Sequence, residues 1–208
     1  MWYPIVLTVL AGYMLGNLNG AVSISTLLNK KDVREQGSGN AGLTNFLRMS
    51  GPKSAVLVIC VDMLKAVIAC LIGKLLLQPY GYSLEGVLVG GIGVCLGHIF
   101  PALLGFHGGK GVLSGVTVAL VADWRLGLLA LLVFALCLWL TRYVSLSSIV
   151  AVLVCIVTFA VVHWQTPAAA IMLFAIGLLI IVMHRSNIAR LLNGTERKAT
   201  FSKFKKKN

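Results

Sequence analysis

Three polar, glycine-rich segments interrupt an otherwise apolar chain of 208 residues, and they hold the side chains that could do chemistry. The segments read GSGNAGLTNFLR (37–48), GHIFPALLGFHGGKGV (97–112) and MHRSNIARLLNGTERK (183–198). Each combines backbone or amide donors with a cation, a combination that is typical of phosphate binding.

In the first segment, glycines at 37 and 39 permit positive φ, so successive N–H groups can point into one anion-binding concavity. Arg48 adds a planar guanidinium group, whose N–H donors can bind two oxygens of a phosphate dianion. The other polar side chains here are Ser38, Asn40, Thr44 and Asn45. A flexible loop is the alternative interpretation.

In the second segment, Lys110 stands among Gly108, Gly109 and Gly111 where a helix should begin, so its ammonium and the following N–H groups could hold a phosphate together. The P-loop pattern GxxxxGK[ST] fails, because positions 104 and 111 are Leu104 and Gly111. A simple re-entrant turn is the alternative. The isolated histidines predict no metal site.

In the third segment, His184 and Asn187 share one face if the segment is helical, which places an imidazole beside an amide at the membrane surface. Glu196 follows. The alternative is a basic juxtamembrane helix. Ser148 belongs to TRYVSLSS (141–148), where capping of a helix is the alternative to a site role.

Asp62 and Lys65 lie three residues apart within one apolar run. Ionisable side chains there usually mark function or a buried pair, and the sequence leaves both interpretations open.

The composition requires a membrane to hold these segments. The chain is 58% hydrophobic and 12% charged, whereas a soluble domain has about 25% charged residues, so soluble and disordered classes are excluded. The net charge is +12, and the basic residues that cause it lie between the apolar runs. This placement favours lipid phosphate or a membrane surface as the partner over nucleic acid. The five cysteines sit inside these runs and predict buried apolar side chains.

An all-α, polytopic protein with seven transmembrane helices is predicted, because a span needs about 20 apolar residues. The spans fall near residues 3–28, 54–77, 85–104, 112–122, 126–141, 144–162 and 168–184. The fourth is short and should be tilted or shielded by neighbours. No positive region precedes the first span, so it should remain as a helix rather than be cleaved.

With the N-terminus outside and the C-terminus in the cytoplasm, all but three of the 18 Lys and Arg residues lie in cytoplasmic loops and the tail; the exceptions are Lys65, Lys74 and Arg125. The positive-inside rule selects this orientation, which places all three polar segments on the cytoplasmic face. The tail from about 197, ending FSKFKKKN, is typical of a polybasic surface anchor.

The three motifs, in this order and with VDMLK and RYVSLSS between them, resemble those of the bacterial membrane acyl-phosphate:glycerol-3-phosphate acyltransferases, the PlsY family. The resemblance covers nearly the whole chain and implies one membrane-embedded domain over 1–208 in the bacterial cytoplasmic membrane. It implies transfer of a fatty acyl group from acyl-phosphate to the 1-hydroxyl of glycerol 3-phosphate, giving lysophosphatidic acid and inorganic phosphate in the first step of phospholipid biosynthesis. No cofactor and no metal are implied.

The resemblance also implies two sets of site residues. The catalytic set is Ser38, Arg48, Lys110, His184 and Asn187. The substrate-binding set is Gly37, Gly39, Asn40, Thr44, Asn45, Gly108, Gly109, Gly111, Ser148 and Glu196.

Elementary chemistry agrees with this activity. An acyl-phosphate is already activated, so no catalytic triad is required, but two phosphate-bearing substrates need cations such as Arg48 and Lys110 to meet. Either His184 or a substrate phosphate can accept the hydroxyl proton. The alternative function is an anion or phosphate-ester transporter, which would use interior cations and broken helices. A CDP-alcohol phosphotransferase would need clustered aspartates, which this chain lacks. The acyl-chain preference and the oligomeric state stay open, and a monomer is compatible with the sequence.

Overall fold

The computed structural model describes residues 2–29 and 31–199, and this part of the chain is all-helical, as predicted. The helices are α1 (Trp2–Gly16), α2 (Gly20–Asn29), α3 (Leu43–Leu77), α4 (Ser83–Ile99), α5 (Val112–Ala122), α6 (Trp124–Thr141), α7 (Val144–Val162), α8 (Pro167–Met183) and α9 (Arg185–Leu192). Short 3-10 turns occur at η1 (Val33–Glu35), η2 (Gln78–Tyr80) and η3 (Ala102–Leu104).

Within the described residues, five helical segments are long and apolar enough to cross a membrane, or six when α8 and α9, bent by 55°, count as one span. Helix α5 is a shorter apolar helix and would be the seventh. The membrane-spanning class is therefore supported, while the number of seven spans stays a prediction.

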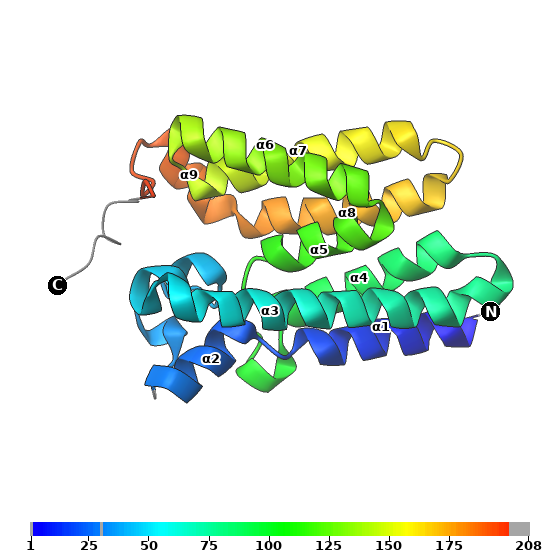
Figure 1. Cartoon of the computed structure of the whole chain (residues 1–208), viewed down its shortest axis with the longest axis horizontal. Coiled ribbons are helices and arrows are strands. Elements are labelled where there is room, and N and C mark those ends of the chain that lie inside the picture. The colour runs from blue at the N-terminus through cyan, green and yellow to red at the C-terminus, as the bar shows by residue number, and fades with distance from the viewer. Residues whose placement is uncertain (1, 30, 200–208) are drawn as a thin grey trace.

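The helices form two layers with α5 between them (Figure 1). Helices α1, α3 and α4 pack together on one side, and α6, α7 and α8 pack together on the other. Glycines allow the close approach of α1 and α4: a Cβ at Gly97 would lie 2.9 Å from the Cα of Gly16. Small residues serve this purpose in membranes, where close backbone contact supplies much of the packing energy.

The short helix α5 contacts α3, α4, α6 and α8, and its buried residues include Gly115 and Val118. Its bounds match the predicted span 112–122. The expectation that neighbours shield this helix is confirmed, because helices on both sides cover it.

The predicted first span, 3–28, agrees with a candidate span over Trp2–Leu28, but this span is broken, because α1 ends at Gly16 and α2 begins at Gly20. Two asparagines account for the break, since such side chains compete for backbone hydrogen bonds. Asn17 accepts a hydrogen bond from Leu103 N at 3.0 Å, and Asn19 Oδ1 accepts one from Val22 N at 3.0 Å as a helix cap.

The predicted second span, 54–77, lies within α3, which also includes a helical stretch from Leu43 that was not predicted. Gly51, with φ of 78°, has a non-helical backbone and is followed by Pro52, so α3 consists of two helical stretches that meet at a kink just before the predicted start. The first helical turns of α3 therefore carry Thr44, Asn45 and Arg48 instead of a loop.

The predicted third span, 85–104, agrees with a candidate span over Ser83–Leu104, in which α4 ends at Ile99 and the chain turns at Pro101 into η3. The remaining helices agree with the predicted spans to within a few residues. The predicted polybasic segment 201–208 lies outside the described residues.

The helix directions bring the three polar segments to one end of the molecule. The starts of α3, α5 and α7 and the ends of α4 and α8 all lie at this end, beside α2 and α9 (Figure 1). The α7–α8 turn and the α3–α4 turn lie at the opposite end.

Candidate functional site

One cavity of about 700 Å³ is lined by residues of all three polar segments and continues between α5, α6, α7 and α8. Most of the predicted site residues line it. They are Gly37, Ser38, Asn40, Thr44, Asn45, Arg48, Lys110, Gly111, Ser148, His184, Asn187 and Glu196. The structure thus brings together side chains from positions 37 to 196, while their roles in binding and catalysis stay predictions.

The first glycine-rich loop is braced by the buried side chain of Asn45. Its Nδ2 donates to Val33 O at 2.9 Å and to Gln36 O at 3.0 Å, and its Oδ1 accepts from Ser38 N at 3.0 Å. Gly37 has φ of 64°, and a Cβ there would collide with Asn45 Oδ1. The loop is therefore held in one shape before any ligand enters.

Lys110 projects into the cavity, and its Nζ donates to Asn187 Oδ1. Burial lowers the pKa of this amine to about 8, with Glu196 acting in the opposite direction and Arg190 and Arg48 adding to the decrease. Because the ammonium is half-buried, it has lost part of its water, so an entering anion would meet a partly desolvated cation.

Glu196 follows α9 and connects the third polar segment to α7 through hydrogen bonds. Its Oε1 accepts hydrogen bonds from Ser145 Oγ and from Asn187 Nδ2, both at 2.7 Å, and its Oε2 accepts from Arg190 Nε at 2.6 Å. Partial burial raises the pKa of this carboxyl, but these three donors outweigh that effect and hold the pKa below its usual value. Glu196 is therefore a carboxylate that fixes the Asn187 amide, with its oxygen toward Lys110.

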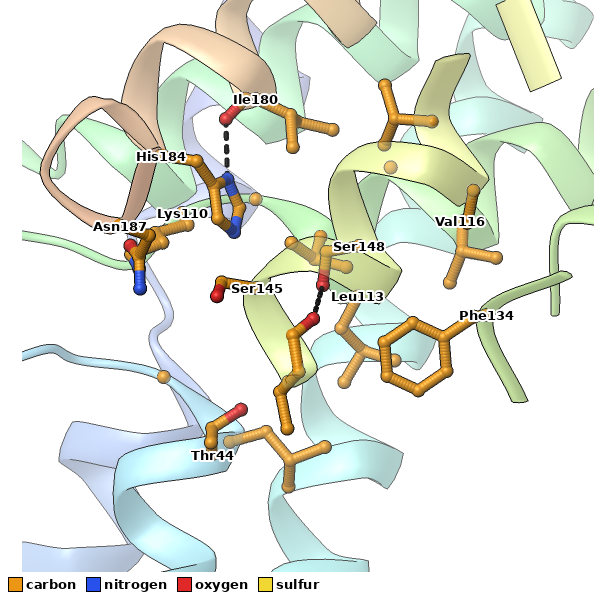
Figure 2. A pocket seen from close by; sticks show the side chains of 18 of the residues that line it. Thr44, Lys110, Leu113, Val116, Phe134, Ser145, Ser148, Ile180, His184 and Asn187 are labelled. Atoms are coloured by element: carbon orange, nitrogen blue, oxygen red, sulfur yellow. Dashed lines mark hydrogen bonds between the residues drawn. The ribbon is translucent and has the colours of Figure 1, made fainter. Parts of the chain in front are cut away.

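His184 stands at the junction of α8 and α9 and is 3% exposed. Its Nδ1 lies 2.8 Å from Ile180 O, and a carbonyl can only accept, so Nδ1 carries the proton. The Nε2 atom then has a free lone pair. Figure 2 shows this ring in the pocket with Lys110, Asn187, Ser145 and Ser148.

Gly39, Gly108 and Gly109 do not line the cavity. Their N–H groups donate to the carbonyls of Gln36, Ile99 and His98, respectively. The structure shows a backbone role for these glycines, and their contact with a substrate stays a prediction.

Ser145 and Arg34 are site-supporting residues that the sequence reasoning missed. Ser145 lines the cavity and binds Glu196, whereas only Ser148 was selected from the serines of TRYVSLSS. Arg34 follows the first span, and its Nη1 donates to Leu104 O at 2.8 Å and to His107 O at 3.2 Å, which ties the first polar loop to the second. The pattern DxR, with Asp32 and Arg34 paired at 2.7 Å, was the available signal.

Away from its polar mouth, the cavity becomes an apolar groove. Leu113, Val116 and Ala119 line it from α5, Phe134 from α6 and Ile156 from α7. Val116 and Phe134 are visible on the side of the pocket away from Lys110 (Figure 2). An alkyl chain whose head group lies at Lys110 would fit this shape.

No group of three His, Cys, Asp or Glu side chains that could hold a metal occurs within residues 2–29 and 31–199.

The fold and the cavity define a membrane-embedded helical protein that can hold an amphiphile with an anionic head group. The chain belongs to the glycerol-3-phosphate acyltransferase family, whose model matches residues 6–194. The PlsY resemblance seen in the motifs is thereby confirmed.

Relatives of known name match over nearly their whole length. A glycerol-3-phosphate acyltransferase of Thermoanaerobacter pseudethanolicus is 42% identical over 193 residues, covering 93% of this chain and 94% of the relative. One of Enterococcus faecalis is 34% identical over 217 residues, covering 98% and 97%.

Two crystal structures share the fold. PlsY, an integral membrane glycerol 3-phosphate acyltransferase, matches in its glycerol 3-phosphate form with a TM-score of 0.86 and 35% identity, covering 94% of this chain and 96% of that one. Its lysophosphatidic acid form matches with a TM-score of 0.82 and 36% identity, covering 94% and 95%.

Proposed function

We propose that this protein transfers a fatty acyl group from acyl-phosphate to the 1-hydroxyl of glycerol 3-phosphate and releases lysophosphatidic acid and inorganic phosphate. The observation that carries the proposal is one cavity that joins the cationic mouth at Arg48 and Lys110 to the apolar groove of α5–α8. Such a cavity can hold a water-insoluble acyl chain and a water-soluble phosphate ester together. The family to which the chain belongs supports the same acceptor.

The two substrates both carry phosphate, so the site must overcome their repulsion. Arg48 supplies positive charge from the start of α3 and Lys110 from the loop before α5, and Arg190 adds a third cation on the cavity wall. A partly desolvated cation attracts an anion more strongly than a hydrated one does. Holding the two reactants at contact distance supplies a large part of the rate enhancement for a donor that is already activated.

The reaction needs no covalent acyl-enzyme. The 1-hydroxyl oxygen of glycerol 3-phosphate forms a bond to the acyl carbonyl carbon, and the bond from that carbon to the bridging phosphate oxygen breaks. The electron pair of that bond leaves with the phosphate. The proton of the hydroxyl passes either to Nε2 of His184, whose lone pair is free, or to a phosphate oxygen. Lys110 stabilises the charge that the leaving phosphate gains.

For the topology, we propose seven spans with α5 included, the N-terminus outside, and the cavity mouth facing the cytoplasm of a bacterial cell. The distribution of Lys and Arg supports this orientation. The whole chain would act as one membrane-embedded domain. Glycerol 3-phosphate would then enter from the cytoplasm, and the acyl chain from the bilayer.

The transporter alternative requires an anion path from one membrane face to the other. The cationic residues of the cavity gather at one end, and the groove beyond them is apolar. An apolar groove would oppose the passage of a phosphate ester, so the cavity does not favour this alternative.

Donor substitution with the purified protein tests the proposal. Palmitoyl phosphate, palmitoyl-CoA and palmitoyl-carrier protein are each supplied with labelled glycerol 3-phosphate, and labelled lysophosphatidic acid is measured. We expect product with palmitoyl phosphate alone. Turnover with palmitoyl-CoA and none with palmitoyl phosphate would contradict the proposed donor, and uptake of glycerol 3-phosphate into proteoliposomes without product would support the transporter.

A further inference from the structure

A buried cluster of Asp62, Lys65 and His98 lies beneath the two glycine-rich loops, and the proposed reaction does not use it. Lys65 Nζ is 2.7 Å from Asp62 Oδ1 and 2.9 Å from His98 Nδ1. All three side chains are nearly inaccessible, although Asp62 and His98 border the cavity. Buried ion pairs within apolar spans stabilise a fold little compared with apolar residues, so this cluster calls for a specific explanation.

The side chains of Asp62 and Lys65 bind the backbone groups that the break between α1 and α2 leaves without helical partners. Lys65 Nζ donates to Leu18 O at 2.6 Å, where α1 has ended, and Asp62 Oδ1 accepts from Gly20 N at 3.1 Å, where α2 begins. Helix ends leave such carbonyl and N–H groups unpaired, and the signs of the two charges match the two helix dipoles. The cluster therefore fixes the path of the chain through the break.

The break in turn holds the first glycine-rich loop. Asn19 lies within the break, and its Nδ2 donates to Ala41 O at 3.0 Å. Ala41 is fully buried and follows the GSGN sequence directly. The position of this loop thus depends on a residue that Asp62 and Lys65 hold in place.

His98 connects the cluster to the second loop. An ammonium has only donors, so His98 Nδ1 accepts from Lys65 and the ring proton is on Nε2. A Cβ added at Gly109 would collide with His98 Nε2 and would lie 2.8 Å from Ala41 O. Gly109 N also donates to His98 O at 3.1 Å. The residue after Gly109 is Lys110, so the ring of His98 supports the turn from which Lys110 extends.

We propose that Asp62, Lys65 and His98 are positioning residues that hold the break of the first span and, through His98 and Gly109, set the place of Lys110 in the cavity. The inference deepens the proposed function and rests on it. It assigns no contact with the reacting atoms to any of the three.

A double-mutant cycle between His98 and Gly109 tests the inference. His98→Asn keeps an acceptor for Lys65 but removes the ring that lies against Gly109, and Gly109→Ala drives a methyl group into that ring. His163→Asn is the matched control, because His163 ends α7 at the opposite end of the molecule. Thermal melts in detergent verify that each variant is folded.

Displacement of a catalytic group by about 1 Å lowers rates by about a hundredfold, so Gly109→Ala should lose about a hundredfold in kcat and His98→Asn about tenfold. The double variant should be at least about tenfold more active than the product of the two single effects, since removal of the ring relieves the shorter of the two clashes of the methyl group. The His163→Asn control should keep its kcat within about twofold, because the contacts of His163 are with Asp123 and Phe159, which lie away from the site.

A second readout is the alkaline limb of the pH profile, which is the decrease of kcat/KM at high pH. The titratable groups that face Lys110 are Glu196, Arg190, Arg48 and His184, and burial is the main cause of its low pKa. If the loop shifts Lys110 toward water, the limb should move from about pH 8 toward 10.5 in Gly109→Ala. A role in stability alone would lower the melting temperature and leave this limb in place.

The inference would be overturned if the effects of the two single substitutions on kcat simply multiply in the double variant. It would also be overturned if Gly109→Ala is folded and impaired but its kcat/KM falls at the same alkaline pH as in the wild type. If His98→Asn does not fold, Gly109→Ala alone decides, because wild-type kcat in that variant contradicts the geometry. A wild-type protein that forms no lysophosphatidic acid would instead remove the proposed function, so the two failures are distinguishable.

Discussion

Replacement of Lys110 is the most informative perturbation, because this ammonium is buried in the cavity and bonded to the Asn187 amide. Lys110→Ala removes a cation from a phosphate that gains charge as it leaves. By comparison with removal of one oxyanion donor, the loss should be about 3–4 kcal/mol, or about a hundred- to a thousandfold in kcat. The fold should survive, because the loop is held by backbone bonds from Gly108 and Gly109.

The pH dependence gives the same prediction a second readout. Lys110 is active as the cation, and burial lowers its pKa to about 8. Wild-type kcat/KM should therefore have its full value below about pH 8 and should fall about tenfold per pH unit above it. Lys110→Arg stays charged throughout, so its residual activity should lack this limb. Its activity should also be well below wild type, since a guanidinium does not fit a glycine turn as an ammonium does.

The assay is steady-state formation of lysophosphatidic acid by protein shown to be folded in a thermal melt. The matched control is Lys74→Ala, which removes an exposed lysine from α3. The control should retain wild-type kcat. Near-wild-type activity in Lys110→Ala, or an alkaline limb that persists in Lys110→Arg, would refute the role assigned to this lysine.

Three further predictions concern charge, chain length and topology. Glu196→Gln should move the alkaline limb below about pH 8, because Glu196 raises the pKa of Lys110; an unchanged limb in a pH–rate profile would speak against their coupling. Ala119→Phe should shift the preference toward shorter acyl chains in a competition assay with acyl-phosphates of mixed length, since Ala119 lines the deep end of the apolar groove; an unchanged preference would place the chain elsewhere. Cysteines placed at Ser38 and at Trp164 should react with an impermeant thiol reagent from the cytoplasmic and the outer side, respectively, and the reverse pattern would invert the topology.

The sequence was informative where residue types were unusual for their surroundings. Polar, glycine-rich segments in an apolar chain predicted one shared site, and the cavity contains residues from all three, including Arg48, Lys110 and His184. Helix α5 was also predicted with the correct bounds, because charged or polar residues flank its apolar run. These predictions needed only local patterns.

The parts that were missed depend on contacts between distant residues. The break after Gly16 lies in an uncharged run, and hydrophobicity alone gave no reason to interrupt the helix there. The helical stretch of α3 before the kink at Gly51, which carries Asn45 and Arg48, was not predicted either. Ser145 and His98 acquire their roles only through Glu196 and Gly109, which no spacing rule connects to them.

The asparagines show which signal was available. Asn17 and Asn19 flank the break, and asparagine favours helix ends because its side chain can cap a helix. Together with Asp62 and Lys65 at the middle of the next span, they were the available signal of a polar junction, which the prediction of the spans did not use. The partners of this junction became apparent only from the fold.

The central claim is that acyl-phosphate and glycerol 3-phosphate react directly in one cavity. The most direct measurement is the ratio of inorganic phosphate to lysophosphatidic acid released by the purified protein, with and without glycerol 3-phosphate. We predict a one-to-one ratio that depends on glycerol 3-phosphate and is lost in Lys110→Ala. Phosphate release without glycerol 3-phosphate at the same rate, or lysophosphatidic acid formed without phosphate release, would contradict the claim.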